Sequence, residues 1–141
     1  MIAKISIDFT GYVTYKESAV TKGRKYYVSR ELESFNLAKM NERCKKDLGG
    51  YLFQLDQWRE QSTITHFIFY AGRGPFFTGI TDEKSEGKFY NYNDNTPAKD
   101  PGWRWFQPDN WWNEDCVEIG QFGLNDRKCG TRGKYICETH V

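Results

Sequence analysis

The first part of the chain alternates apolar and polar residues, which is the pattern of strands. Residues 5–9, Ile-Ser-Ile-Asp-Phe, alternate as a half-buried strand does. Residues 12–15 and 25–28 are further strand candidates, separated by a polar segment that contains glycine. The pattern therefore predicts several strands before any helix.

The period then changes to that of a helix. Leu37, Met40, Cys44 and Leu48 follow one another at steps of three, four and four residues, which places them on one helical face. Gly49-Gly50 is a helix-ending pair, and we expect Ser34 or a neighbouring residue to cap the start. Residues 51–53 then predict a short buried strand.

A second helix is predicted from about residue 57 to residue 70. Ile64, Phe67 and Ile68 share one face, although the β-branched residues 63–65 weaken the pattern. Gly72 and the pair Gly74-Pro75 end the segment.

Residues 81–113 have no regular period and predict a long loop. Loops of this length inside a domain are usually functional or disordered. Four tryptophans within this loop favour order, and a bound metal is the obvious ligand that could hold an irregular loop in one conformation. Strands resume at 116–119, 123–126 and 135–137, so the expected fold class is α+β.

Composition narrows the function. The 141 residues carry a net charge of +1, which disfavours nucleic acid and anionic lipid as partners. No apolar stretch has the length of a membrane-spanning helix. The first residues lack the apolar core of a signal peptide, so we expect a cytosolic protein or a mature form without its leader. Aromatic residues make up 17% of the chain, and some of these rings are expected at the surface.

The chain has 4 cysteines and 2 histidines, without the spacing of a zinc site. An even cysteine count in a small, loop-rich chain favours two disulfides and an oxidising compartment. Free buried thiols in a cytosolic domain are the alternative, and three pairings are open. His66 and His140 stand at no recognisable catalytic spacing.

Five oxygen-bearing side chains cluster late in the chain. Calcium takes six to eight oxygen ligands from carboxylates and carbonyls, and the absence of thiolate or imidazole disfavours zinc and copper. Each element alone is also typical of an ordinary turn or a solvated charge. Their order between cysteines favours a calcium site formed by Gln107, Asp109, Glu114, Asn125 and Asp126.

Several segments together resemble the C-type lectin domain. They are 105–111, Trp-Phe-Gln-Pro-Asp-Asn-Trp; 113–117, Asn-Glu-Asp-Cys-Val; Asn125-Asp126; and 135–138, Tyr-Ile-Cys-Glu. Residues 37–52 are similar to the first helix and following strand of that family, and 77–80 occupy the place of its Trp-Ile-Gly-Leu. The resemblance covers 26–138, with Leu124 in place of the usual tryptophan before Asn-Asp.

The resemblance implies a single C-type lectin-like domain over 1–141. Residues 1–25 would form an N-terminal strand extension, and two helices would flank small antiparallel sheets beside a long irregular calcium-binding loop. It implies disulfides Cys44–Cys137 and Cys116–Cys129, the five calcium ligands above, and a cis peptide bond before Pro108. A secreted protein that forms homo-oligomers is compatible with this family.

The resemblance also implies a function, the calcium-dependent binding of terminal galactose or N-acetylgalactosamine on cell-surface glycans or glycoproteins. Two sugar hydroxyls would coordinate calcium and contact Gln107, Asp109, Glu114 and Asn125. Gln-Pro-Asp accompanies galactose in this family and Glu-Pro-Asn accompanies mannose. Trp111 is expected to pack on the sugar, with a loop anchor as its alternative, although the glycine-rich insertion of well-known galactose-selective members is missing.

Three other functions compete with this one. A structural or protein-binding domain without sugar binding is the first, and a lectin that also takes mannose-type or N-acetylglucosamine ligands is the second. The third, glycoside hydrolysis by Asp109 and Glu114, needs one carboxyl with a raised pKa, whereas a shared calcium lowers the pKa of its ligands. We therefore expect no enzyme. Asp94, Asp100 and Asp115 are interpreted as solvated loop charges.

Overall fold

The computed structural model describes residues 5–7, 12–16, 23–56, 60–70, 74–99, 101–103, 107 and 114–140. The helices are α1 (Leu37–Leu48) and α2 (Glu60–Tyr70). The strands are β1 (Ile5–Ile7), β2 (Tyr12–Lys16), β3 (Arg24–Ser29), β4 (Glu33–Ser34), β5 (Tyr51–Leu52), β6 (Phe76–Thr81), β7 (Tyr90–Asn91), β8 (Thr96–Pro97), β9 (Cys116–Gly120), β10 (Gly123–Arg127) and β11 (Arg132–His140). This mixture confirms the predicted α+β class.

Helix α1 forms where the apolar spacing predicts it. Leu37, Met40 and Cys44 are buried on one face. Asn36, rather than Ser34, caps the start, because its side-chain oxygen accepts a hydrogen bond from the backbone N–H of Lys39 at 2.9 Å. The helix ends at Gly49, whose φ of 72° lies in the left-handed region that suits glycine.

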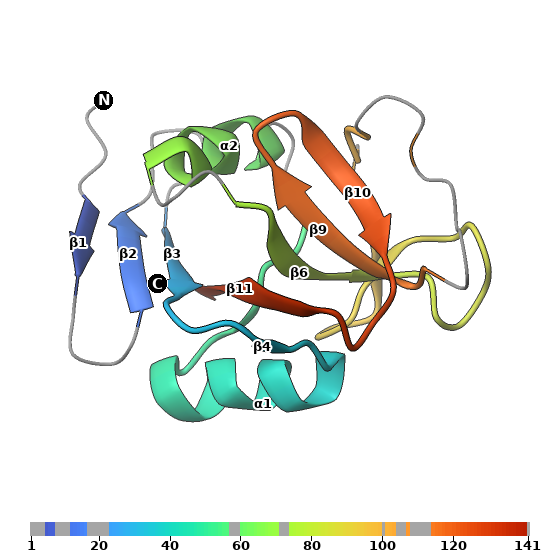
Figure 1. The fold of residues 1–141 in the computed structure, drawn as a ribbon, viewed down its shortest axis with the longest axis horizontal. Coiled ribbons are helices and arrows are strands. Elements are labelled where there is room, and N and C mark those ends of the chain that lie inside the picture. Colours follow the sequence, from blue (N-terminus) through green and yellow to red (C-terminus); the bar gives the residue numbers. More distant parts are fainter. Residues whose placement is uncertain are drawn as a thin grey trace.

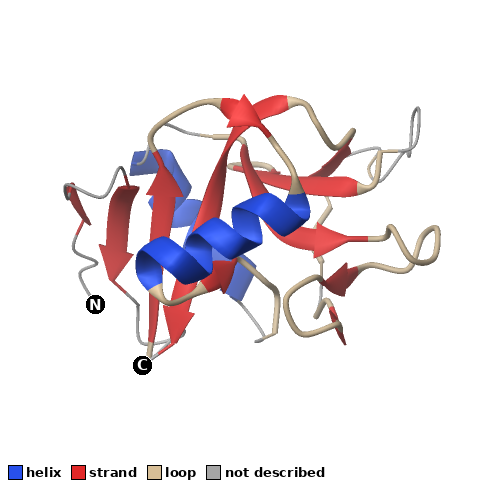
Figure 2. Cartoon of the chain, turned by 90° about the horizontal axis from the view of Figure 1, so that it is seen from below, coloured by secondary structure: helices blue, strands red, loops and turns tan. Residues whose placement is uncertain are grey.

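Helix α2 confirms the second predicted helix, and its described start is Glu60. Ile64, Phe67 and Ile68 are fully buried, so packing against the sheet outweighs the weak helix propensity of the β-branched residues. Figure 1 shows α2 above the sheet and α1 below it, and Figure 2 shows α1 in front with the second helix behind. The two helices therefore cover opposite faces.

Strand β11 is the centre of the sheet. It pairs antiparallel with β3, β4 and β5, and parallel with β6 (Figure 1). The main order is β1-β2-β3-β11-β6-β7-β8, and β9 pairs with both β6 and β10. The small antiparallel sheets that the sequence predicted are present, and they join into one connected set of strands. The parallel contact between β11 and β6 provides the connection.

Two disulfides join the cysteine pairs that the family resemblance implied. Cys44–Cys137 ties α1 to β11, and Cys116–Cys129 ties the start of β9 to the turn that precedes β11. Gly50 lies beside the first bond, and a Cβ added to it would fall 2.1 Å from the carbonyl oxygen of Glu138. The close approach of this segment to β11 therefore requires a glycine.

The core has two parts, one on each side of β11. The first packs α2 against the sheet and includes Ile64, Phe67 and Ile136. The second packs α1 against the other face, where the Phe35 and Phe77 rings stack with centroids 4.3 Å apart. Leu124, which replaces a tryptophan of the family pattern, is fully buried in the first part.

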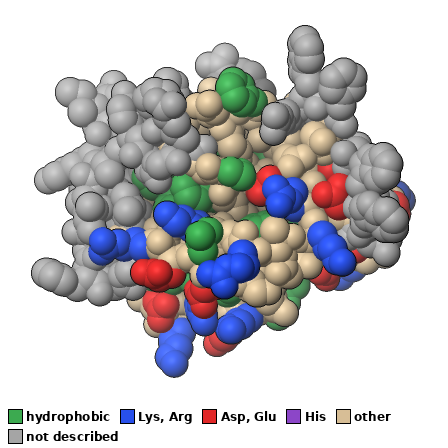
Figure 3. Space-filling view, viewed as in Figure 1, with side chains coloured by type: hydrophobic (Ala, Val, Ile, Leu, Met, Phe, Trp, Pro, Cys, Tyr) green, Lys and Arg blue, Asp and Glu red, His purple; other side chains and the backbone are tan. Residues whose placement is uncertain are grey.

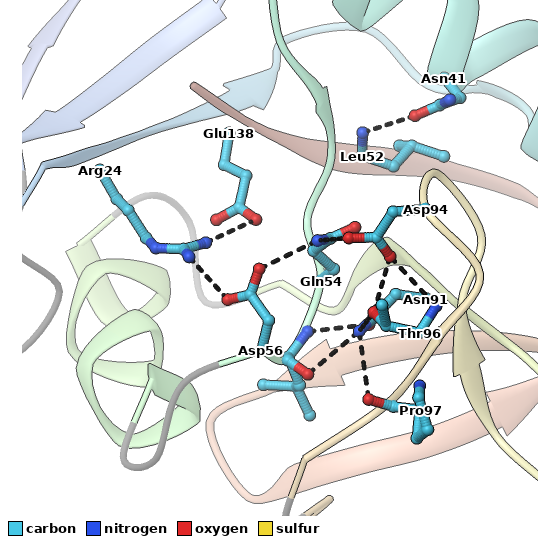
Figure 4. Close-up of polar contacts among 11 residues, drawn as sticks. Arg24, Asn41, Leu52, Gln54, Asp56, Asn91, Asp94, Thr96, Pro97 and Glu138 are labelled. Atoms are coloured by element: carbon cyan, nitrogen blue, oxygen red, sulfur yellow. Dashed lines mark hydrogen bonds and ion pairs between the residues drawn. The ribbon is translucent and has the colours of Figure 1, made fainter. Parts of the chain in front are cut away.

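The described residues after 81 contain more regular structure than their sequence predicts. Asn91 in β7 is fully buried, and its amide both donates to the carbonyl of Leu55, at 3.1 Å, and accepts from its N–H, at 3.0 Å. Gln54 donates to Asp94 at 2.9 Å (Figure 4). Protein side chains therefore hold the described residues 90–97, where the sequence suggested a metal. Asp94 belongs to this network and is not simply a solvated charge.

Candidate functional site

The hairpin of β9 and β10 positions two of the predicted calcium ligands. Its register pairs Asn125 with Glu118 and Asp126 with Val117. Burial alternates along β10, so Asp126 is only 1% exposed whereas Asn125 is half-buried on the other side of the strand. Neighbouring positions in the sequence thus provide one buried carboxylate and one accessible amide.

A cross-strand contact fixes the orientation of Asn125. Its Nδ2 donates to Oε1 of Glu118 at 2.9 Å, and the same oxygen accepts from Nη1 of Arg127 at 3.1 Å. Glu118 is itself buried, with 6% exposure. Because the amide nitrogen faces Glu118, the amide oxygen of Asn125 faces away from that carboxylate. One of the two N–H groups also remains for a second partner.

The other predicted ligands fall partly within the described residues. Gln107 and Glu114 are half-buried. Glu114 lies two residues before β9, next to the hairpin end where Cys116 pairs with Arg127, and Asn125 and Asp126 pair with Glu118 and Val117 further along the hairpin. Asp109, Pro108 and Trp111 lie outside the described residues. The structure thus places Asn125 and Asp126 in the β9–β10 hairpin and Glu114 in the segment that leads into it.

A second acidic group, which we call the acidic cluster, consists of Asp82, Glu86 and Asp115. One carboxylate oxygen from each residue lies within 4.8 Å of the others. The pairing of β6 with β9 explains the arrangement: Thr81 lies opposite Cys116, so Asp82 after one strand meets Asp115 before the other. Thr81 also donates a hydrogen bond to the carbonyl of Asp115.

The electrostatics of the acidic cluster suit a cation. Burial raises the pKa of Asp82, and the neighbouring Glu86 raises it further. Burial and the charge of Asp82 likewise raise the pKa of Asp115. Asp82 is 3% exposed; its Oδ2 accepts from the N–H of Gly87 at 2.9 Å, while its buried Oδ1 accepts no hydrogen bond from the part of the chain that the structure describes. Such an oxygen is suited to a metal ligand.

Asp115, which the sequence interpretation treats as a solvated loop charge, is half-buried and lies close to two other carboxylates. The sequence carried a usable signal, because Asp82 and Glu86 are two carboxylates four residues apart directly after a strand segment. A second group of possible ligands, Glu83 with Cys116 and Cys129, differs in kind. Its two sulfurs are already joined in a disulfide, so they offer no thiolate to a metal.

The described surface has no dominant charge on the face that Figure 3 shows. Basic and acidic side chains are mixed along the lower part of this face, where α1 lies in Figure 1. Within the described residues, neither helix has the length and apolar character needed to cross a membrane.

Comparison with known sequences finds relatives among lectins. Collectin-11 of Bos taurus is 33% identical over 93 residues, which are 64% of this chain and 34% of that protein. A perlucin-like protein of Mytilus galloprovincialis is 30% identical over 96 residues, 64% of this chain and 62% of that protein. The chain thus spans about a third of the first relative and under two thirds of the second.

Comparison with solved structures agrees. The carbohydrate-recognition domain of the mouse scavenger receptor C-type lectin has a TM-score of 0.74 and 27% identity, covering 92% of this chain and 94% of that one. The human counterpart has a TM-score of 0.75 and 26% identity, covering 96% and 100%. The Kupffer cell C-type lectin receptor Clec4f, in a trimeric structure, has a TM-score of 0.69 and 27% identity, covering 85% and 80%.

The family model for the lectin C-type domain matches residues 33–139, most of the chain. This span contains both helices, both disulfides and the hairpin of β9 and β10. The chain therefore belongs to the C-type lectin domain family, with carbohydrate-recognition domains rather than enzymes as its structural relatives.

Proposed function

We propose that this chain is a calcium-dependent lectin that binds terminal galactose or N-acetylgalactosamine on glycans. The observation that carries the proposal is the hydrogen bond from Asn125 to Glu118, which turns the amide oxygen of Asn125 away from that carboxylate. Together with Gln107, Asp109, Glu114 and Asp126, Asn125 would form an oxygen-only ligand set, as calcium prefers.

The chemistry of the residues fits calcium better than a transition metal. The set contains three carboxylates and two amides, with no thiolate or imidazole among them. When bound, calcium would accept two neighbouring sugar hydroxyls as ligands.

The side chains would hold the sugar as well as the ion. Asn125 keeps one N–H after donating to Glu118, and this group can donate to a sugar hydroxyl. The carboxylates of Asp109 and Glu114 can accept a hydroxyl proton, and Gln107 supplies a second amide donor. Preference for galactose rests on the order Gln107-Pro108-Asp109, and Trp111 would pack on the apolar face of the sugar.

We further propose that the acidic cluster binds a second calcium ion. The buried Oδ1 of Asp82 and the raised pKa values of Asp82 and Asp115 support this assignment. Asp115 follows Glu114 directly, so an ion in the cluster would stiffen the segment that carries a ligand of the first site. The sugar site and the acidic cluster would then be coupled through two adjacent residues.

The wider biology follows from the relatives. We propose a secreted or otherwise extracellular domain spanning 1–141, with the strands of 1–25 as an extension of the family core over 26–138. Both disulfides suit an oxidising compartment. A homo-oligomer would add avidity to a single shallow sugar site, and the trimer formed by Clec4f is the precedent among similar structures.

Retention on immobilised galactose tests the proposal. In calcium, the protein should bind the column and be released by a chelator or by free galactose, but not by free mannose. Asp109→Ala should lose retention while its far-ultraviolet circular dichroism stays unchanged, and Glu31→Gln, at an exposed position, serves as the matched control.

Other outcomes separate the alternatives. Release by mannose or N-acetylglucosamine as well would keep the lectin and remove the galactose selectivity. Absence of retention on galactose and on a broad glycan array, with no calcium-dependent change in melting temperature, would overturn the proposal. The family fold would then serve as a structural or protein-binding domain.

A further inference from the structure

The backbone of Gly102 joins three separate parts of the fold. Its carbonyl oxygen accepts a hydrogen bond from the backbone N–H of Leu124 in β10, at 2.9 Å, and another from Nε2 of Gln61 in α2, at 2.7 Å. Its own N–H donates to Oε1 of Gln61 at 2.8 Å. A carbonyl oxygen has two lone pairs, so the hairpin uses one of them and the helix uses the other.

Gln61 pairs with Gly102 much as the backbone of a neighbouring strand would. Its side-chain amide donates through the nitrogen and accepts through the oxygen, and so satisfies both backbone polar groups of Gly102. We call this pair of hydrogen bonds the Gln61–Gly102 clamp. Gln61 is half-buried near the described start of α2, and the buried Ile64 and Phe67 hold that helix in the core. The clamp therefore ties an irregular segment to a packed helix.

The clamp lies next to a strand that carries two of the proposed calcium ligands. Leu124, which donates to Gly102, directly precedes residues 125–126 in β10. Leu124 also forms an isolated parallel bridge with Trp103, and the Trp103 ring packs against that of Phe89 with centroids 4.7 Å apart. The segment that contains Trp103 is thus held by the hairpin on one side and by α2 on the other.

The clamp also stands at the start of a segment that carries another proposed ligand. Gln107 follows Gly102 by 5 residues, and a chain of that length spans at most about 18 Å. The position of Gly102 therefore limits where Gln107 can lie relative to residues 125–126. We infer that Gln61 is a positioning residue of the calcium site, which acts through Gly102 and does not itself ligate the ion. This inference rests on the proposed function and names a residue on which the calcium affinity of that site depends.

The physical effect of the clamp is to order part of the site before calcium arrives. Without these two hydrogen bonds, the ion itself would have to hold the segment in place, and the conformational entropy lost on binding would weaken its affinity. Once calcium is bound, its ligands are in position whether the clamp is present or not. Loss of the clamp should therefore change the calcium affinity and leave the sugar affinity at saturating calcium unchanged. A residue that touched the sugar would show the reverse.

Two substitutions remove the clamp from opposite sides. Gln61→Ala deletes both hydrogen bonds without weakening α2, because alanine has the highest helix propensity. Ser62→Ala, at the next and exposed position of the same helix, is the matched control. A Cβ added to Gly102 would lie 2.8 Å from Nε2 of Gln61, and the three atoms nearest to it all belong to that side chain. Gly102→Ala therefore displaces the amide of Gln61.

The experiment titrates calcium alone by calorimetry, in an Asp82→Asn background that removes the ion of the acidic cluster. Gln61→Ala should raise the calcium Kd about tenfold, the size expected from two hydrogen bonds of ordinary strength, and Ser62→Ala should leave it unchanged. Gly102→Ala should raise the Kd by a smaller factor. Adding Gly102→Ala to Gln61→Ala should raise it no further, because the displaced side chain is already gone. At saturating calcium, methyl galactoside should bind Gln61→Ala as tightly as the background.

Other outcomes overturn the inference. If Gln61→Ala binds calcium as tightly as its background, even with a lower melting temperature in the absence of calcium, the clamp is structural only. Additive effects of the two substitutions, or a loss confined to sugar affinity at saturating calcium, would also overturn it. Circular dichroism without calcium checks that each variant is folded, and Gly102→Ala provides the test if Gln61→Ala does not fold. If the background itself binds no calcium, the proposed function fails.

Discussion

Two groups of carboxylates in this fold differ in where their positive charge comes from. In the first, Nη1 of Arg24 lies 3.1 Å from Glu138 and Nη2 lies 2.8 Å from Asp56 (Figure 4). In the second, Asp82, Glu86 and Asp115 gather with their carboxylate oxygens within 4.8 Å of one another. The chain supplies a cation to the first group and crowds negative charge in the second.

The pKa directions follow the same division. Asp94 adjoins the first group through Gln54; burial raises the pKa of its carboxyl, but hydrogen bonds from Thr96 and Gln54 outweigh burial and lower it. For Asp82, burial and Glu86 both raise the pKa. The difference teaches that the chain itself compensates the charge of the first group, whereas the second group is suited to an added cation.

Removal of Arg24 should have the largest effect. Arg24→Met leaves Glu138, which is fully buried, without its positive partner, and we expect the free energy of unfolding to fall by about 3–5 kcal/mol. Urea denaturation should show the same loss with and without calcium. Lys46→Met, on the exposed face of α1, should change stability by less than about 0.5 kcal/mol. If calcium restored the stability of Arg24→Met, the first group would also depend on an added cation, and the contrast between the two groups would fail.

Neutralisation of Asp82 should act only when calcium is present. In an Asp109→Ala background, which removes the sugar-site ion, calcium at a hundred times the Kd of the acidic cluster should stabilise the protein by about 2.7 kcal/mol. Asp82→Asn, if it weakens affinity about a hundredfold, should retain about 0.4 kcal/mol of this. Thermal unfolding over a calcium titration measures both values.

The result without calcium is equally informative. There Asp82→Asn should be at least as stable as its background, because one of the crowded charges is gone. Glu31→Gln should behave as the background does at every calcium concentration. If Asp82→Asn is less stable without calcium and the background does not respond to the ion, the acidic cluster is a structural group.

The smallest effect should come from an ion pair at the surface. Arg43 donates a hydrogen bond to Glu33 and holds the pKa of that carboxyl below its usual range. Because the folded-state pKa is lowered, the pair stabilises above the unfolded pKa of Glu33 and loses its contribution as pH falls through the folded pKa. Glu33→Gln should therefore cost less than about 1 kcal/mol at pH 7, and nothing once both states are protonated.

Denaturation of wild type and Glu33→Gln from pH 7 down to the acid limit checks this sign. A stability difference that grows on acidification would contradict it. The contribution of this pair to stability is the smallest of those compared, because solvent screens a surface ion pair more than a buried one.

Long periodic segments were predictable from sequence, and short ones were not. Leu37, Met40 and Cys44 define α1 by their spacing alone. Strands β4, β7 and β8 have two residues each, too few to show alternation, and form because neighbouring strands and the amide of Asn91 hold them. A periodic pattern shows which side of an element is buried, and a strand of two residues is too short to show one.

The sites divide in the same way. Glu114, Asn125 and Asp126 could be predicted as ligands because they lie close together in sequence and resemble a family pattern. The acidic cluster was missed because Asp82 and Asp115 meet only through the pairing of Thr81 with Cys116, a register that no local pattern reveals. The orienting role of Glu118 depends likewise on its cross-strand position opposite Asn125.

The central place of β11 has a consequence for how the chain folds. Its partners β3, β4, β5 and β6 all precede it in the sequence, and the disulfide from α1 to β11 spans 93 residues. Contacts of such long range close large loops before they gain any pairing energy, which slows folding. During synthesis, four earlier strands must wait with unpaired edges until residues 132–140 leave the ribosome. Folding of this domain is therefore completed only after β11 has been synthesised.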